Sequence, residues 1–178
     1  MTRDLSVRVA TLNDLDAIVE LRLALLREYD AHPFYSRLRP DVGARAHELY
    51  RSQLSSPYET IFVAVRNHSV VGVLRCVDTA TSPVLLPERY CYVSSVYVKP
   101  GERRRGVLRA LLAAAERWCD ERDISEMRLH NSATSTEARG AWASLGFEVV
   151  EEVRRRDVHP PKPSNGRHTP PREHAEVR

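Results

Sequence analysis

The sequence has few cysteines, almost no lysine and no long apolar run. No window approaches about eighteen consecutive apolar residues, so we expect no transmembrane helix. The first residues lack the apolar core of a secretory signal, so we expect a cytoplasmic protein. The three cysteines, Cys76, Cys91 and Cys119, are odd in number, and their spacings fit neither a zinc site nor a disulfide framework. We therefore expect reduced thiols and no bound metal.

The positive charge is concentrated at the C-terminal end of this chain of 178 residues, which has room for one domain. Residues 154–178 carry seven basic and three acidic side chains, whereas the preceding 153 residues carry 20 basic and 21 acidic ones. A nucleic-acid-binding body is disfavoured, because no basic face dominates it. The basic tail leaves open an interaction protein that uses this segment to bind nucleic acid or an acidic partner.

Apolar periodicity predicts alternating strands and helices. The predicted strands are 5–10, 60–66, 70–78, 90–98, 126–131 and 147–153. The predicted helices are 15–29, 41–54, 106–122 and a last one that is capped by Thr134 and Glu137 and ends at Gly146. The buried face of the helix at 106–122 is predicted to carry Leu108, Leu111, Leu112, Ala115 and Cys119. This order predicts an α/β domain with a mixed sheet flanked by helices. Five of the eleven prolines lie in 160–171, so we expect a domain over 5–158 and a disordered Pro/Arg-rich tail over 159–178.

The segment 96–112 carries the chemistry. A strand ends at Val98, and an arginine-rich turn with Gly106 leads directly into a helix. The first amides of a helix are unpaired and lie at the positive end of its dipole, so this turn predicts a site for an anion such as a pyrophosphate. Gly106 allows close approach of the backbone, and the flanking arginines add positive charge.

Two motifs in register resemble a known family. The first combines Val98, Pro100, Arg103 and Gly106 with the leucine pair Leu111 and Leu112. The second, further along the chain, consists of Ala138, Trp142, Gly146 and Phe147. Over residues 5–153 the chain is similar to the GNAT superfamily of acetyl-CoA-dependent N-acetyltransferases.

The resemblance implies a GNAT-like splayed sheet, with pantetheine between the strands at 92–98 and 127–131. It implies acetyl-CoA as co-substrate and a primary amine, of a small molecule or a protein, that attacks the thioester directly in a ternary complex. The amide of Val96 would donate to the thioester oxygen. The implied acetyl-CoA-binding residues are Val96, Tyr97, Val98, Arg103, Arg104, Arg105, Gly106, Val107, Leu108, Arg109, Ala138 and Trp142.

Three positions depart from the family pattern. Leu108 replaces a small residue, Trp142 replaces the tyrosine that protonates the leaving thiolate, and Ser94 replaces a glutamate base. Ser94, acting through water, and His130 are the candidate catalytic residues, because a histidine can accept a proton near neutral pH. A non-catalytic acyl-CoA-binding module remains an alternative.

The C-terminal end also departs from the pattern. Family members close with two strands beside the strand that corresponds to 127–131, whereas Arg154 to Val158 offer only a short charged segment before Pro160. Proline cannot donate to a ladder, so we expect a truncated final strand pair. The incompletely covered edge at 127–131 makes a homodimer plausible.

Overall fold

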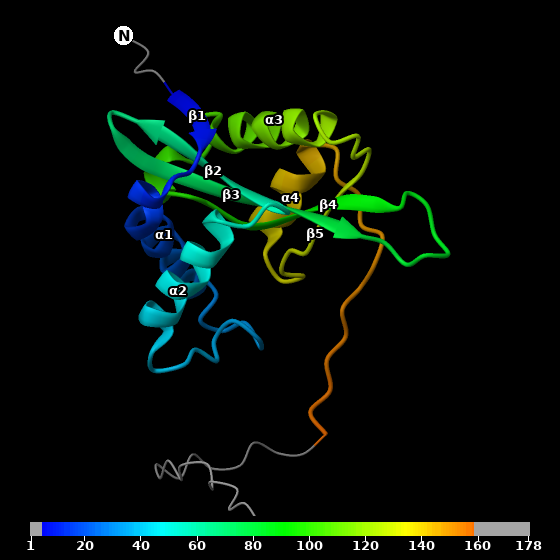
Figure 1. Ribbon diagram of the computed structural model, residues 1–178. Coiled ribbons are helices and arrows are strands. Elements are labelled where there is room, and N and C mark those ends of the chain that lie inside the picture. The colour runs from blue at the N-terminus through cyan, green and yellow to red at the C-terminus, as the bar shows by residue number, and fades with distance from the viewer. Residues whose placement is uncertain (1–4, 159–178) are drawn as a thin grey trace, which may run out of the picture.

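The computed structural model describes residues 5–158, which form a five-stranded sheet with helices on both faces (Figure 1). The strands are β1 (Leu5–Val9), β2 (Glu59–Arg66), β3 (Ser69–Ala80), β4 (Arg89–Val98) and β5 (Met127–Leu129). The helices are α1 (Leu15–Glu28), α2 (Val42–Leu54), α3 (Val107–Asp120) and α4 (Thr136–Ser144), with 3-10 turns η1 (Leu12–Asp14) and η2 (Pro100–Glu102). This arrangement confirms the predicted fold class.

The sheet has the order β1-β2-β3-β4-β5. The first four strands are antiparallel neighbours, and only β4 and β5 are parallel. The β2–β3 hairpin turns at Asn67 and His68, which have φ angles of 51° and 62°. A two-residue hairpin loop with both φ angles positive matches the twist of the strands, so the predicted hairpin is confirmed.

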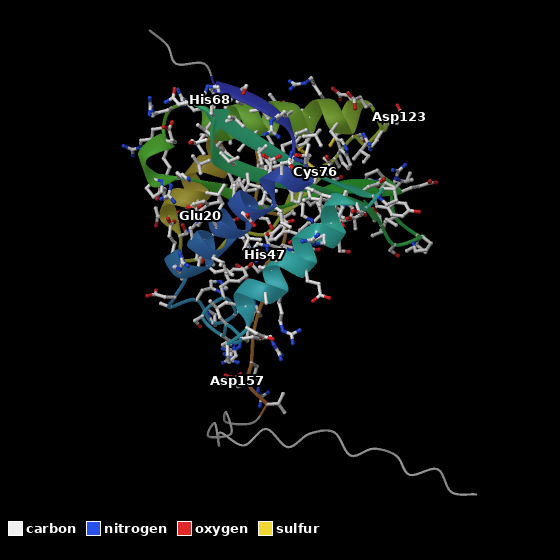
Figure 2. The ribbon with its side chains drawn as sticks, turned by 60° about the vertical axis from the view of Figure 1, so that its left-hand side comes forward. Glu20, His47, His68, Cys76, Asp123 and Asp157 are labelled. Atoms are coloured by element: carbon white, nitrogen blue, oxygen red, sulfur yellow. The ribbon has the colours of Figure 1, made fainter. Side chains whose placement is uncertain are left out.

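Two apolar cores lie on opposite faces of the sheet. One packs α1 and α2 against the sheet and includes Ile18, Leu21 and Tyr50. The other packs α3 against the opposite face and includes Leu111 and Leu112. Figure 1 shows α3 above the sheet and α1 and α2 below it, and Figure 2 shows Glu20 on α1 and His47 on α2.

The three cysteines lie buried in the core beneath α3, as free thiols. The Cys119 thiol lowers the pKa of Cys91, but Cys76 and burial outweigh it and raise that pKa to about 12. Thiols in such surroundings stay protonated and unreactive, which fits the expectation of reduced thiols.

Gly72 of β3 brings α3 close to the sheet. A Cβ atom at this position would lie 2.9 Å from Cγ1 of Val107 and 3.2 Å from Cδ1 of Leu111. The missing side chain therefore sets how closely the first turn of α3 approaches β3.

Local details correct three sequence-based expectations. Ser135, not Thr134, caps α4, because its hydroxyl accepts a hydrogen bond from the amide of Ala138 at 3.2 Å. Leu108, expected on the buried face of α3, is half-exposed, and Val107 is buried in its place. The predicted strand at 147–153 does not form.

Residues 147–158 have no regular secondary structure. Their valines, Val149, Val150, Val153 and Val158, are all exposed. β5 is only three residues long and offers a short pairing edge, which explains why the alternating pattern of this segment finds no partner. In both views the segment leaves the domain, and Figure 2 places Asp157 clear of the helices and strands. The predicted tail, 159–178, lies outside the described residues.

Within residues 5–158, no helix has the length and apolar character needed to cross a membrane.

Candidate functional site

β4 and β5, at one end of the sheet, separate after three paired residues. Their parallel pairing runs from Cys91 and Met127 to Val93 and Leu129 and ends there. Within residues 5–158, no strand pairs with the remainder of β4, Ser94–Val98, on that side. This free edge leaves backbone donors and acceptors available to an extended ligand. Ser94 and His130, the two candidate catalytic residues, each follow the last pair directly and so flank the mouth of the gap.

A β-bulge lies next to the gap. Val73 pairs with Tyr97 and Arg75 with Ser94, so Ser95 and Val96 together face the single residue Leu74. Ser95 has a φ angle of 52°, and its hydroxyl accepts a hydrogen bond from the Tyr50 hydroxyl at 3.0 Å. A bulge takes its extra residue out of the ladder, so the backbone at 95–96 is directed differently from the rest of the strand.

The turn from β4 to α3 presents backbone amides. Arg104 and Gly106 have φ angles of 60° and 82°, and the first α-helical bond runs from the Ala110 amide to the Gly106 carbonyl at 3.0 Å. The amides of Val107, Leu108 and Arg109 therefore have no helical acceptor. A Cβ added to Gly106 would meet nothing within 4 Å, so the space above the turn is open. These free amides and the open space above Gly106 form a cradle that fits a phosphate group.

The arginines of this turn have different surroundings. Nη2 of Arg103 lies 2.8 and 2.7 Å from the two carboxylate oxygens of Glu28, and its Nε donates to the Val98 carbonyl. Arg105 donates to Glu102. Arg104 and Arg109 are exposed and have no ion pair within residues 5–158. Arg103 therefore holds the turn in place, while Arg104 and Arg109 have their guanidinium groups free.

The end of β4 contacts both cores. Val96 and Val98 pack toward α3, and Tyr97 lies buried in the core beneath α1 and α2. The Tyr97 hydroxyl donates to Glu28 at 2.7 Å, and burial together with that carboxylate raises the pKa of Tyr97 to about 12. The side chains of these three residues are therefore engaged in packing, and their backbone is what faces the gap.

Helix α4 packs loosely on the core beneath α3. None of its residues is buried, and Ala138 and Trp142 are half-buried. The Trp142 ring packs against the core beneath α3 and makes an edge contact with Phe147 at a centroid distance of 5.2 Å. The half-exposed indole leaves apolar surface for a ligand to cover.

A polar group lies on the face of β4 that carries α1 and α2. The Tyr92 hydroxyl lies 3.1 Å from Nδ1 of His130, and the Ser94 hydroxyl accepts a hydrogen bond from Arg75 at 3.1 Å. Arg75 is also paired with Glu59. Burial raises the pKa of Tyr92. A phenol with a raised pKa stays protonated at neutral pH.

Sequence reasoning missed Tyr92, Arg75 and Glu59. The only available signal was the alternation along β4, which puts Tyr92 and Ser94 on one face. Their contacts with His130 and Arg75 depend on strand register, which the sequence alone does not give.

The model of the acetyltransferase (GNAT) family matches residues 21–147. The aminoglycoside N(6')-acetyltransferase type 1 of Salmonella typhimurium is 34% identical over 62 residues, which are 35% of this chain and 43% of that protein. The chain thus spans less than half the length of this relative. The Acinetobacter haemolyticus protein of the same name is 25% identical over 125 residues, 66% of this chain and 82% of that protein.

Solved structures share the fold. A predicted acetyltransferase from Clostridium acetobutylicum, solved with acetyl-CoA, has a TM-score of 0.72 at 18% identity and covers 87% of this chain and 97% of its own. An aminoglycoside antibiotic 6'-N-acetyltransferase from Acinetobacter baumannii has a TM-score of 0.71 at 14% identity, with 89% and 100% covered.

Proposed function

Because the chain belongs to the acetyltransferase (GNAT) family, we propose that it transfers an acetyl group from acetyl-CoA to a primary amine. The amine attacks the thioester directly in a ternary complex, with no covalent enzyme intermediate. One observation carries this proposal, namely that the gap between β4 and β5 opens beside the amide-rich turn at Arg103–Arg109. An extended chain and a pyrophosphate each find a matching surface there.

The turn binds the diphosphate through its backbone. The amides of residues 104–109 donate, and Arg104, Arg105 and Arg109 add positive charge. Arg103 supports the turn instead, because its amide donates to the Pro100 carbonyl at 3.3 Å and its guanidinium is held by Glu28. The half-exposed Leu108 leaves its amide free to donate.

The free edge of β4 holds the pantetheine through the backbone of Val96, Tyr97 and Val98. The amide of Val96, next to the bulge, polarises the thioester carbonyl. Ala138 and Trp142 of α4 cover the opposite side. When bound, acetyl-CoA supplies an activated acetyl group, and much of the acceleration comes from holding the amine against it.

Tyr92 and His130 form a proton relay on the acceptor side. When Oη of Tyr92 accepts a proton, it passes its own phenolic proton to Nδ1 of His130, 3.1 Å away. Ser94 orders a water molecule at the mouth of the gap and is itself held by Arg75. Since Trp142 is a poor acid, solvent protonates the leaving thiolate.

Replacement of Gly106 by valine tests the proposal. A β-branched side chain at a φ angle of 82° is strained and lies over the cradle, so Gly106→Val abolishes acetyl-CoA binding in calorimetry. Gly101→Val is the matched control, because Gly101 belongs to the same turn, has open space around it and lacks a positive φ angle. Circular dichroism verifies that both variants are folded. Unchanged affinity in Gly106→Val contradicts the proposed binding site.

Turnover is measured by release of free CoA thiol. Acetyl-CoA binding without transfer to any amine indicates the non-catalytic acyl-CoA-binding module, which Ser94 and Trp142 at the proton-transfer positions favour. A cytoplasmic location and a homodimer stay predictions from the sequence.

A further inference from the structure

The amides of β4 change sides at the bulge. Before it, the Cys91 amide donates to the Glu126 carbonyl, directly before β5. After it, the Lys99 amide donates to the Val71 carbonyl of β3. The amides of a regular strand alternate between its two edges, so Cys91 and Lys99, an even number of positions apart, would face the same edge. The bulge at Ser95 therefore reverses the alternation.

This reversal decides which amide faces the gap. Because the Lys99 amide faces β3, the Tyr97 amide does so as well, and the Val96 amide faces the gap. The side chains reverse with the backbone, since Val93 and Val96, an odd number of positions apart, both pack in the core beneath α3. Without the bulge, the Val96 amide would point toward β3 and could not reach a thioester in the gap.

Tyr50 of α2 supports the bulge through Ser95. With a φ angle of 52°, Ser95 has a left-handed conformation, which is strained for a residue other than glycine. Its hydroxyl accepts a hydrogen bond from the Tyr50 hydroxyl at 3.0 Å. Tyr50 is only 2% exposed, and within residues 5–158 Ser95 is the one hydrogen-bond partner of its hydroxyl. The bond thus offsets the strain at Ser95 and ties the bulge to a packed helix.

We propose that Tyr50 is a positioning residue for acetyl transfer, because its hydrogen bond holds Ser95 in the left-handed conformation and so keeps the Val96 amide aimed at the thioester oxygen. The inference rests on the proposed acetyl transfer and adds a residue to it. A donor stabilises charge on that oxygen best when it is oriented before the charge develops. Since Tyr50 is buried, it acts through the backbone of the bulge and not by contact with acetyl-CoA.

Tyr50→Phe tests this role, because it removes the hydroxyl and keeps the ring that packs in the core beneath α1 and α2. We expect kcat to fall roughly tenfold or more, since the Val96 amide is misplaced and not lost. The affinity for CoA, which lacks the acetyl group, should stay unchanged. Ser95→Ala removes the same hydrogen bond from the other side and should lower kcat as much. The variant with both changes should be no slower than either one.

Ser95→Gly in the Tyr50→Phe background separates positioning from stability. Glycine adopts a φ angle near 52° without support, so this double variant should regain most of the lost kcat although the hydroxyl is still missing. Ile18→Val is the control, because it removes one buried methyl group from the same core and should lower stability without lowering kcat. A kcat that stays low in the double variant, or that falls equally in Ile18→Val, overturns the inference.

Infrared spectroscopy of bound acetyl-CoA with an isotope-labelled thioester carbonyl detects the same contact without turnover. A hydrogen bond from the Val96 amide should lower the carbonyl stretching frequency in the wild-type protein. Tyr50→Phe should raise it again, and adding Ser95→Gly should reverse that change. Equal frequencies in wild type and Tyr50→Phe overturn the inference and leave the proposed acetyl transfer standing. Failure of the wild-type protein to bind acetyl-CoA contradicts the proposed function, and the inference with it.

Discussion

Arg103 and Glu28, 75 residues apart in the chain, join the turn before α3 to the C-terminal end of α1. Glu28 also accepts a hydrogen bond from Tyr97, so one carboxylate ties together α1, β4 and the turn. The resemblance implies Arg103 among the acetyl-CoA-binding residues. In the structure its guanidinium organises the turn whose amides we propose as the ligands of the diphosphate.

Glu28→Gln should therefore weaken both the fold and the cofactor site. We expect a loss of about 1 kcal/mol in the free energy of unfolding, a modest value because the pair is partly exposed, together with weaker acetyl-CoA binding. Denaturant titration and calorimetry measure the two effects. Glu20→Gln is the control, because Glu20 is exposed and its pair with Lys99 is long, at 3.9 Å. Equal stability of the two variants would contradict this role for Glu28.

The sequence predicted the motifs well because their information is local. The hairpin at Asn67 and His68 and the strand–turn–helix around Gly106 depend on neighbouring residues, and the structure has both. The Arg103–Glu28 pair and the Tyr92–His130 contact depend on how distant segments pack, which periodicity does not specify. The prediction of a strand at 147–153 failed for a similar reason, since its alternating pattern suits a strand but β5, the expected partner, is only three residues long.

Gly72→Ala should move the start of α3. The added methyl group would lie 2.9 Å from Val107 and 3.2 Å from Leu111, so α3 or β3 must shift. We expect a destabilisation of about 1–3 kcal/mol, typical of overpacking, and weaker acetyl-CoA binding, since the amides of the first turn of α3 move with it. Thermal unfolding and calorimetry measure these effects.

Gly43→Ala serves as the control for Gly72→Ala. Gly43 lies in α2 with nothing within 4 Å of its Cβ position, so alanine there should stabilise the helix by up to about 1 kcal/mol. If Gly72→Ala proves as stable as Gly43→Ala, the close approach of α3 is not set by this glycine.

Asp14 should make stability depend on acid pH. The hydrogen bond from Arg8 lowers the pKa of Asp14 to about 2, burial opposes the shift, and Thr11 adds to the lowering. A folded-state pKa below the unfolded value gives stability that is complete above about pH 4–5 and is lost as the pH falls toward 2. Because Arg8 is half-exposed, we expect this contribution to be about 1 kcal/mol.

Asp14→Asn tests this dependence. The stability difference between the wild-type protein and the variant should be largest above pH 5 and should shrink as the pH falls through 4 toward 2. Urea titrations at a series of pH values measure it. Asp16→Asn is the control, because the Asp16 side chain is almost fully exposed. A difference that is constant across this range would show that Asp14 does not titrate with a lowered pKa.

Tyr92 and His130 should act as one unit in proton transfer. Tyr92→Phe removes the hydroxyl 3.1 Å from Nδ1 of His130 and keeps the ring, so packing is preserved. We expect kcat to fall roughly tenfold or more, the lower part of the range for general acid–base catalysis, with unchanged acetyl-CoA affinity. Tyr90→Phe is the control, because the Tyr90 ring stacks beneath Arg128 and survives the substitution.

His130→Gln should lower kcat as much as Tyr92→Phe does. Since each substitution breaks the same relay, the double variant should be no slower than either single variant. Costs in kcat that multiply in the double variant would mean that the two residues act separately, and an unchanged kcat in Tyr92→Phe would remove the relay from the mechanism.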